Sequence, residues 1–289
     1  MAAPLDMTQV EKSLEGFTIP PRPDLLIQLQ KELEKPEPNS RFIGQLISKD
    51  MGIAGFAIKV VNTPFFGLKR KIESIEHACM FLGPERVFKL VRSILLRYEF
   101  SSAENDPFLN TLWQTSEKIA DACMAISHFF GFDFIDEIYS IGMFHDAGIA
   151  LVCQQVDNYP EILKSAYEQD ELTISEYEEN AFASSHEILG FLIAQSWGLS
   201  HEISTVIAYH HSCQTILATG NYTEKQMFSV LKLAEHMVGN GKLLAGAVSD
   251  LEWEKYNEQI MDILEIEYFQ LFDIGEMLYG FGLDNAYHK

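Results

Sequence analysis

The sequence predicts an all-α protein, a multi-helix bundle of about a dozen helices. Apolar residues recur at helical spacing along almost the whole chain. Residues that start or stop helices are frequent, and no Asn-Gly or Asp-Gly turn lies between runs of alternating apolar residues. With 289 residues, 47% of them hydrophobic, and 20 Phe, 11 Tyr and 3 Trp, the chain has ample material for a core and is not intrinsically disordered.

The first hundred residues divide into five expected helices with recognisable ends. Pro36 and Pro38 end the first helix, because proline cannot continue one. Asn39 or Ser40 can cap the second, and Pro84 suits the first position of the fifth, where no N–H is needed. The five expected ranges are 24–34, 40–47, 52–61, 74–82 and 84–97.

A polar break at 101–106, followed by Pro107, is the best candidate for a boundary between subdomains. We therefore expect an N-terminal helical subdomain over 1–106, a second helical subdomain over 107–248 and an acidic C-terminal helical extension over 249–289. Beyond the break, helical spacing predicts helices over 107–130, 135–155, 160–169, 174–182, 186–197, 201–211, 223–238, about 250–265 and 267–279.

The chain carries 42 acidic and 21 basic residues, which gives a formal net charge of −21. This charge disfavours nucleic acids and anionic membrane surfaces as partners, because both are bound through clustered Lys and Arg. The N-terminus lacks the basic and apolar run of an export signal, and every apolar stretch is well short of the ~20 residues that span a bilayer. The four cysteines are far apart, so we expect free thiols and a cytoplasmic location.

The charge is unevenly distributed. Between Lys12 and Arg97 there are 14 basic and 9 acidic residues, whereas from Tyr98 onward there are 7 basic and 31 acidic ones. The acidic excess first of all promotes solubility. The N-terminal subdomain, with the basic run Lys-Arg-Lys at 69–71, would in addition suit an acidic surface on a protein partner.

Five of the nine histidines interrupt apolar, helix-like runs. His145 precedes Asp146 in the run Ile-Gly-Met-Phe-His-Asp-Ala-Gly, and burying an ionised Asp costs several kcal/mol unless it is paired or binds a metal. Comparable interruptions occur at His186, at His210-His211 and at Glu235-His236. Four separate helices therefore bring imidazole or carboxylate groups out of apolar faces.

Two interpretations of these residues remain open. Imidazole and carboxylate groups together form a ligand set for Fe, Mn, Zn or Ni, and helical bundles build such sites from neighbouring helices. Alternatively, they are hydrogen-bonded polar residues of the core. Gly142 and Gly148 flank the His145-Asp146 doublet and would let neighbouring helices approach it. The candidate metal ligands are His145, Asp146, His186, His210, His211 and Glu235. No site is suggested by the other histidines outside these runs, which are His77, His128, His201 and His288.

Short motifs are spread over roughly residues 18–215. They are Ile19-Pro20-Pro21, the Asn-Thr-Pro-Phe-Phe-Gly turn at 62–67, Ile72-Glu-Ser-Ile75, Leu82-Gly83, Leu112-Trp113, His145-Asp146, His186-Glu-Ile-Leu-Gly190, Trp197-Gly198-Leu199 and Tyr209-His210-His211. In this order they resemble the HDOD domain, a bacterial signalling relative of the HD-GYP phosphodiesterases within the HD superfamily. The resemblance implies a helical bundle of HD-superfamily type with an N-terminal helical subdomain.

Residue by residue, the resemblance implies an incomplete catalytic site. Active HD enzymes carry an additional His on the helix before the doublet, where this sequence has Thr115. The late Asp of the superfamily falls at Glu235, a longer carboxylate that can still coordinate a metal. No Gly-Tyr-Pro follows His211, so the signature loop of the HD-GYP enzymes is missing.

Two functions follow from the resemblance. The one we favour is a stand-alone bacterial signal-transduction module with a degenerate HD metal site, which acts mainly through a signalling protein partner. The alternative is a metal-dependent phosphohydrolase or phosphodiesterase for a small phosphate ester, with Asp146 as its catalytic residue. Lys164 is the only Lys or Arg between Ile119 and Cys213, and this scarcity of positive charge argues against an efficient enzyme.

In the enzymatic alternative, the resemblance implies a metal centre in which Asp146 could bridge two ions. His210 or His211 would hold the second ion. The first divalent ion would be held by His145, Asp146, His186 and Glu235.

The C-terminal extension is rich in aromatic residues at helical spacings. We expect its helices to pack back on the bundle, and a partner-docking face is the alternative. The large side chains concerned are Trp253, Tyr256, Tyr268, Phe269, Phe272, Met277 and Tyr279.

Overall fold

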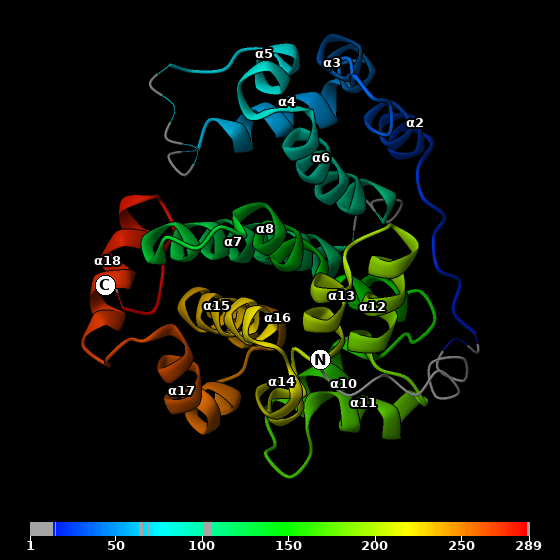
Figure 1. Cartoon of the computed structure of the whole chain (residues 1–289). Helices are drawn as coiled ribbons and strands as arrows, with labels where there is room; N and C mark the ends of the chain where they lie inside the picture. The colour runs from blue at the N-terminus through cyan, green and yellow to red at the C-terminus, as the bar shows by residue number, and fades with distance from the viewer. Residues whose placement is uncertain are drawn as a thin grey trace. The chain divides into compact units, whose positions relative to one another are not determined.

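The structure, a computed structural model, describes residues 14, 16–63, 66, 68, 70–100 and 106–287. Every regular element within these residues is a helix, which confirms the all-α prediction (Figure 1). The chain forms two compact units, one over residues 21–102 and the other over the described parts of 1–20 and 103–289. Several positions named above lie outside the described residues: His288, residues 101–105 of the polar break, residues 64, 65 and 67 of the Asn-led turn, and residue 69 of the basic run.

The unit over 21–102 contains five helices, close to the expected ones. They are α2 (Asp24–Leu33), α3 (Ser40–Ile47), α4 (Met51–Val61), α5 (Ile75–Leu82) and α6 (Pro84–Glu99). The side chain of Asn39 accepts from the backbone N–H of Phe42 at the start of α3, and Pro84 opens α6. Helix α3 packs on α5, and α4 packs on α6.

The side chain of Asn62, the first residue of the turn at 62–67, bonds to backbone groups on both sides of that turn. Its side-chain Oδ1 accepts from the N–H of Ile72 at 2.7 Å, and its Nδ2 donates to the carbonyls of Ile72 at 2.7 Å and Ile58 at 2.9 Å. One amide side chain thus joins the end of α4 to the chain ten residues further on. Only a side chain with both a donor and an acceptor can satisfy both backbone groups of Ile72.

The second unit contains the remaining helices, with α8 packed along α7, and α15 in contact with both α7 and α17 (Figure 1). Its helices are α7 (Pro107–Phe130), α8 (Ile135–Phe144), α9 (Ala147–Val152), α10 (Tyr159–Tyr167), α11 (Ile174–Phe182), α12 (His186–Ser196), α13 (His201–Ala208), α14 (Cys213–Thr219), α15 (Tyr222–Val238), α16 (Asn240–Ala245), α17 (Leu251–Leu264) and α18 (Gln270–Gly280).

The expectation of one helix over 135–155 is wrong. The structure breaks this segment into α8 and α9 at His145 and Asp146, where Asp146 leaves helical geometry with φ −95° and ψ 8°. Helices α14 and α16, which have seven and six residues, were not predicted either. Helices this short are not stable alone and depend on tertiary packing, so their sequence pattern is weak.

Two glycines set the helix packing around this break. A Cβ on Gly142 would lie 2.5 Å from Cα of Ala120 on α7, and a Cβ on Gly148 would lie 2.0 Å from the carbonyl oxygen of His186 on α12. The close approach expected at both glycines is therefore confirmed. Helix α8 lies against α7, and α9 lies against the start of α12, with no room for a side chain between them.

The C-terminal helices α17 and α18 belong to the second unit. Trp253 and Leu264 of α17 are buried, as are Leu271 and Leu278 of α18. The same segment exposes large aromatic side chains, with 49–70% of each residue accessible: Tyr268 and Phe269 directly before α18, and Phe272 and Tyr279 on it. The extension therefore packs back on the bundle and also keeps an aromatic stripe at the surface.

Two further expectations concern the thiols and the membrane. Cys79, Cys123, Cys153 and Cys213 are all free. Among the described helices, none combines the length and the apolar character that crossing a membrane requires.

Candidate metal centre

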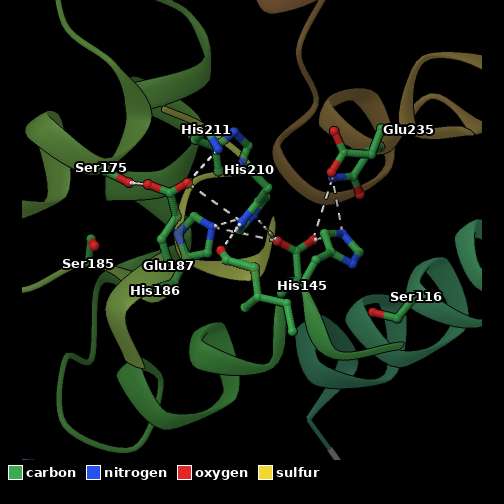
Figure 2. A network of polar contacts seen from close by, with 12 residues as sticks. Ser116, His145, Ser175, Ser185, His186, Glu187, His210, His211 and Glu235 are labelled. Atoms are coloured by element: carbon green, nitrogen blue, oxygen red, sulfur yellow. Dashed lines mark hydrogen bonds and ion pairs between the residues drawn. The ribbon is translucent and has the colours of Figure 1, made fainter. Parts of the chain in front are cut away.

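The six candidate ligands of the sequence analysis gather at one place in the second unit, where the labelled histidines surround a common centre (Figure 2). His145 Nε2 lies 3.0 Å from Asp146 Oδ2 and 3.6 Å from Glu235 Oε1. All six residues are buried, with at most 5% of any of them exposed. Four of them offer one ligand atom each within 4.8 Å of the others: Asp146, His186, His210 and His211.

Asp146 stands between two groups of ligands. Its Oδ1 faces His210 Nε2 at 3.4 Å and His186 Nε2 at 3.6 Å, whereas its Oδ2 faces His145. The expected first set joined His186 to His145 and Glu235. The structure instead brings His186 together with the His210-His211 pair, and leaves His145 beside Glu235.

The four histidines of the centre share one hydrogen-bond pattern. In each ring, Nδ1 lies against an oxygen acceptor, so that the neutral form of the ring can donate its proton there and carry its lone pair on Nε2. Metal-bound histidines in proteins are oriented by such outer partners. The acceptors are the Gly142 carbonyl for His145 at 2.9 Å, the Glu178 carboxylate for His186 at 2.8 Å, the Ile207 carbonyl for His210 at 2.8 Å and the Glu252 carboxylate for His211 at 2.9 Å.

The centre holds buried polar side-chain atoms without a hydrogen-bond partner. Four such atoms have no hydrogen-bond partner among the described residues, and burying them unsatisfied costs free energy. A cation placed among them would offset this cost, so a divalent metal ion fits the residues present, and the donor set suits Fe, Mn, Zn or Ni. The four atoms are His145 Nε2, Asp146 Oδ1, His211 Nε2 and Glu235 Oε1.

The ionisation of the centre follows from burial and from its own charges. Burial opposes ionisation of Asp146, but the neighbouring imidazoles, led by His145, outweigh it and hold the pKa of Asp146 well below its usual value. Burial holds the pKa of His210 and of His211 well below the usual value, and nearby positive groups add to the effect. Both rings are therefore neutral at neutral pH, the state in which imidazole binds a metal.

Two buried glutamates accept hydrogen bonds from the histidines on the side away from the ligand cluster. The Glu178 carboxylate contacts His186 Nδ1, accepts from the His186 backbone N–H at 2.8 Å, and accepts from the Tyr159 hydroxyl at 2.5 Å. Glu187 accepts from the His211 backbone N–H at 2.5 Å and from the hydroxyl of Ser212 at 3.1 Å. Burial raises the pKa of Glu187 to about 7.

A buried lysine enters the centre from α15. Lys232 Nζ lies 2.5 Å from Glu235 Oε2 and 2.7 Å from Glu252 Oε2. Burial opposes its charge, but Glu235 and Glu252 outweigh burial and raise the pKa of Lys232 well above its usual value. Lys232 thus brings one positive charge next to the ligands from outside the span Ile119–Cys213, which contains few basic residues.

Other residues considered from the sequence are not part of the described ligand cluster. His236 bonds to Asp250 and Tyr287 and stacks on Trp253, which gives it a packing role. Thr115 is buried on α7. Three further histidines are exposed at the surface: His77, His128 and His201.

Four residues around the ligands were not predicted from the sequence: Glu178, Glu187, Lys232 and Glu252. One of them carried a usable signal: Glu178 shares a helix face with Ile174 and Phe182, at spacings of four, and so interrupts an apolar stripe. Glu252 carried none, because its partners His211 and Lys232 lie 41 and 20 residues away in the sequence.

A cavity of about 370 Å³ lies beside the centre, with His211, Tyr167 and Glu252 in its wall. Among the described residues that line it, Lys255 is the one Lys or Arg. Six carboxylates surround it: Asp170, Glu171, Glu176, Glu179, Asp250 and Glu252. The approach to the centre from this side is therefore strongly acidic.

The affinity of the centre for Zn²⁺ is expected to rise between pH 6 and pH 8, by up to tenfold per pH unit. Burial opposes the charge on His186, but Glu178 and then Asp146 outweigh it and raise the pKa of His186 to about 9. Below that pH the metal must displace a proton from the ring, so binding weakens as pH falls. Calorimetric titration in buffers of different ionisation enthalpy measures both the affinity and the protons released.

Glu178→Gln is the matched variant for this pH effect. It removes the charge that raises the pKa of His186, so the rise of Zn²⁺ affinity with pH should occur at lower pH in this variant. An affinity that does not change between pH 6 and pH 8 in the unaltered protein would contradict the assignment.

The sequence model of the HDOD domain matches residues 19–213 of this chain. A curated relative, an uncharacterized protein of Treponema pallidum (strain Nichols), is 25% identical over 198 residues, which cover 67% of this chain and 38% of the relative. The chain therefore spans less than half the length of that relative.

Solved structures show the same fold. An HDOD domain protein of unknown function from Geobacter sulfurreducens is 19% identical with a TM-score of 0.60, and the match covers 93% of this chain and 97% of that one. A proposed metal-dependent phosphohydrolase from Shewanella amazonensis SB2B is 16% identical with a TM-score of 0.66, and the match covers 95% of each chain. The family match, which extends over more than half of the sequence, identifies the chain as a member of the HDOD domain family.

Proposed function

We propose that this chain is a bacterial, cytoplasmic signal-transduction module that acts through a signalling protein partner. Its HD-type centre is degenerate, binds a divalent metal ion and does not hydrolyse phosphate esters efficiently. The ion would be held by Asp146, His186, His210 and His211, with His145 and Glu235 on the other side of the aspartate.

The acidic cavity beside the centre is the observation that carries this proposal. A phosphate ester approaching from the cavity would meet six carboxylates against Lys255 alone. Hydrolases of phosphate esters place positive charge where the phosphoryl oxygens bind, because charge develops there during reaction. Lys232 does not serve this purpose, since it is 5% exposed and already pairs with Glu235 and Glu252.

The missing imidazole at position 115 supports the same conclusion. Thr115 is buried on α7 and offers a neutral hydroxyl, a far poorer ligand for these metals than imidazole. With one ligand of the active enzymes absent, the metal would mainly neutralise and hold together the buried carboxylate and imidazoles.

A metal-dependent phosphohydrolase is the second candidate, and the position of Asp146 favours it. Its two oxygens face different sets of histidines, as expected of a carboxylate that bridges two metal ions in phosphoesterases. A divalent ion supplies positive charge and an activated water to such reactions. Asp146 would then be the residue on which activity depends.

The two functions are separated by metal analysis and turnover assays on protein purified without chelator. We expect about one divalent metal ion per chain, and rates with cyclic dinucleotides and aryl phosphate esters no higher than those of Asp146→Ala. Metal-dependent turnover that disappears in Asp146→Ala would establish the hydrolase instead. Protein that takes up no Fe, Mn or Zn would remove the metal from both proposals.

A further inference from the structure

We infer that Glu252 of α17 is a positioning residue for the metal centre, because it holds His211 in the tautomer whose Nε2 can bind a metal. The C-terminal helices, which lie beyond the residues that match the HDOD domain, would thereby form part of the centre. The inference rests on the proposed metal centre, but its first test needs no metal.

The contacts of Glu252 define this role. Its Oε1 and Oε2 lie 3.0 Å and 2.9 Å from His211 Nδ1, and its Oε2 also lies 2.7 Å from Lys232 Nζ. An ionised carboxylate only accepts hydrogen bonds, so the proton of the neutral ring belongs on Nδ1. The lone pair is then on His211 Nε2, which has no hydrogen-bond partner among the described residues, and His211 is one of the four residues of the ligand cluster.

A simple ion pair between Glu252 and Lys232 would not explain this geometry. Lys232 already contacts Glu235 at 2.5 Å, so its charge has a partner without Glu252. Both oxygens of Glu252 nevertheless lie within hydrogen-bond distance of His211 Nδ1. This bidentate approach is what orients the ring and raises its basicity as a ligand.

The same contacts connect α17 to both groups of ligands. Lys232 joins Glu252 to Glu235, and Glu235 Oε1 in turn faces His145 on the Oδ2 side of Asp146. Metal binding and the packing of α17 should therefore stabilise each other, since coupling between two sites is reciprocal. Through α17 the centre would be linked to the C-terminal segment that carries the exposed aromatic stripe.

The first test measures the tautomer of His211 in the metal-free full-length protein by long-range ¹H–¹⁵N NMR of the imidazole rings. We expect the Nδ1-protonated form in the unaltered chain. In Glu252→Gln the amide can accept from only one of the two donors, and its NH₂ group repels the other, so a mixture of tautomers is expected. Glu254→Gln is the matched control, since Glu254 is an exposed residue of the same helix.

The second test measures Zn²⁺ affinity by competition with a chelator, together with hydrogen exchange of α17. Glu252→Gln should bind Zn²⁺ about 10–100-fold more weakly, as is usual when an outer partner of a metal ligand is lost. Zn²⁺ should slow exchange of the α17 amides in the unaltered protein and in Glu254→Gln, and much less in Glu252→Gln.

The outcomes distinguish this inference from the proposed function. An Nε2-protonated His211 in the unaltered protein would overturn the inference, and this measurement needs no variant that folds. Equal Zn²⁺ affinity in Glu252→Gln and in the unaltered protein would overturn it as well. If the unaltered protein binds no metal, the proposed function fails, whereas the tautomer still decides what Glu252 does.

Discussion

Gly148→Ala is expected to destabilise the second unit by about 3 kcal/mol and to abolish metal binding. The added Cβ would lie 2.0 Å from the carbonyl oxygen of His186 and 2.8 Å from the backbone nitrogen of Gly190. Both obstacles are backbone atoms, so no side chain can rotate away and α9 must separate from α12. Since His186 opens α12 and Asp146 immediately precedes α9, the separation would pull the two ligands apart.

Urea unfolding measures the stability, and Zn²⁺ titration measures the centre. The control is Gly280→Ala in the same unit, because a Cβ at Gly280 meets no atom within 4 Å. That variant should be neutral or slightly more stable, since alanine loses less backbone entropy than glycine on folding. A stable Gly148→Ala protein that still binds Zn²⁺ would show that α9 and α12 can separate without harm.

Helix ends could be predicted because their signals are local. Asn39, Ser74 and Ser200 each cap a helix with a side-chain oxygen that accepts from the backbone N–H three residues later. Pro84 opens α6 for an equally local reason. Such caps involve atoms only a few residues apart, so the sequence contains all the information needed to place them.

The break between α8 and α9 could not be predicted in the same way. The segment around it is apolar on every side and is buried from Ile138 to Val152, so helical spacing gave no sign of an end. The contacts on either side of the break are tertiary: Gly142 of α8 packs against α7, and Gly148 of α9 packs against α12. Gly142 and Gly148 predict a close approach of helices, but a close approach does not by itself predict a bend.

In the site, too, some residues could be predicted from the sequence and others could not. Polar residues inside apolar runs identified the six candidate ligands, because a buried charge needs a partner wherever that partner comes from. The outer partners of the histidines could not be recognised in this way where they lie in polar helices, because a charged residue there is expected. Glu252 sits in the segment Leu-Glu-Trp-Glu-Lys-Tyr, where a glutamate is unremarkable until the fold brings it to His211.

Asp146→Asn is expected to weaken Zn²⁺ binding by more than 100-fold. Loss of an outer partner of a metal ligand costs about 10–100-fold in affinity. Asp146 is itself one of the proposed ligands, so its loss should cost more. It is the residue whose oxygens face both groups of ligands, at 3.0 Å from His145 Nε2 and 3.4 Å from His210 Nε2. Asparagine keeps the shape but removes the charge that attracts the cation.

The loss should also appear in thermal stability. With free Zn²⁺ at about 100 times the dissociation constant of the unaltered protein, binding adds about 2.7 kcal/mol to its stability, which corresponds to a rise in Tm of about 5–10 °C. At the same concentration Asp146→Asn should gain about 0.4 kcal/mol or less. Asp133→Asn, at an exposed position of the same unit, should gain as much as the unaltered protein. Equal Zn²⁺-dependent rises in Tm for Asp146→Asn and the unaltered chain would mean that the ion binds elsewhere, because Asp146 is the one carboxylate in the described four-residue cluster.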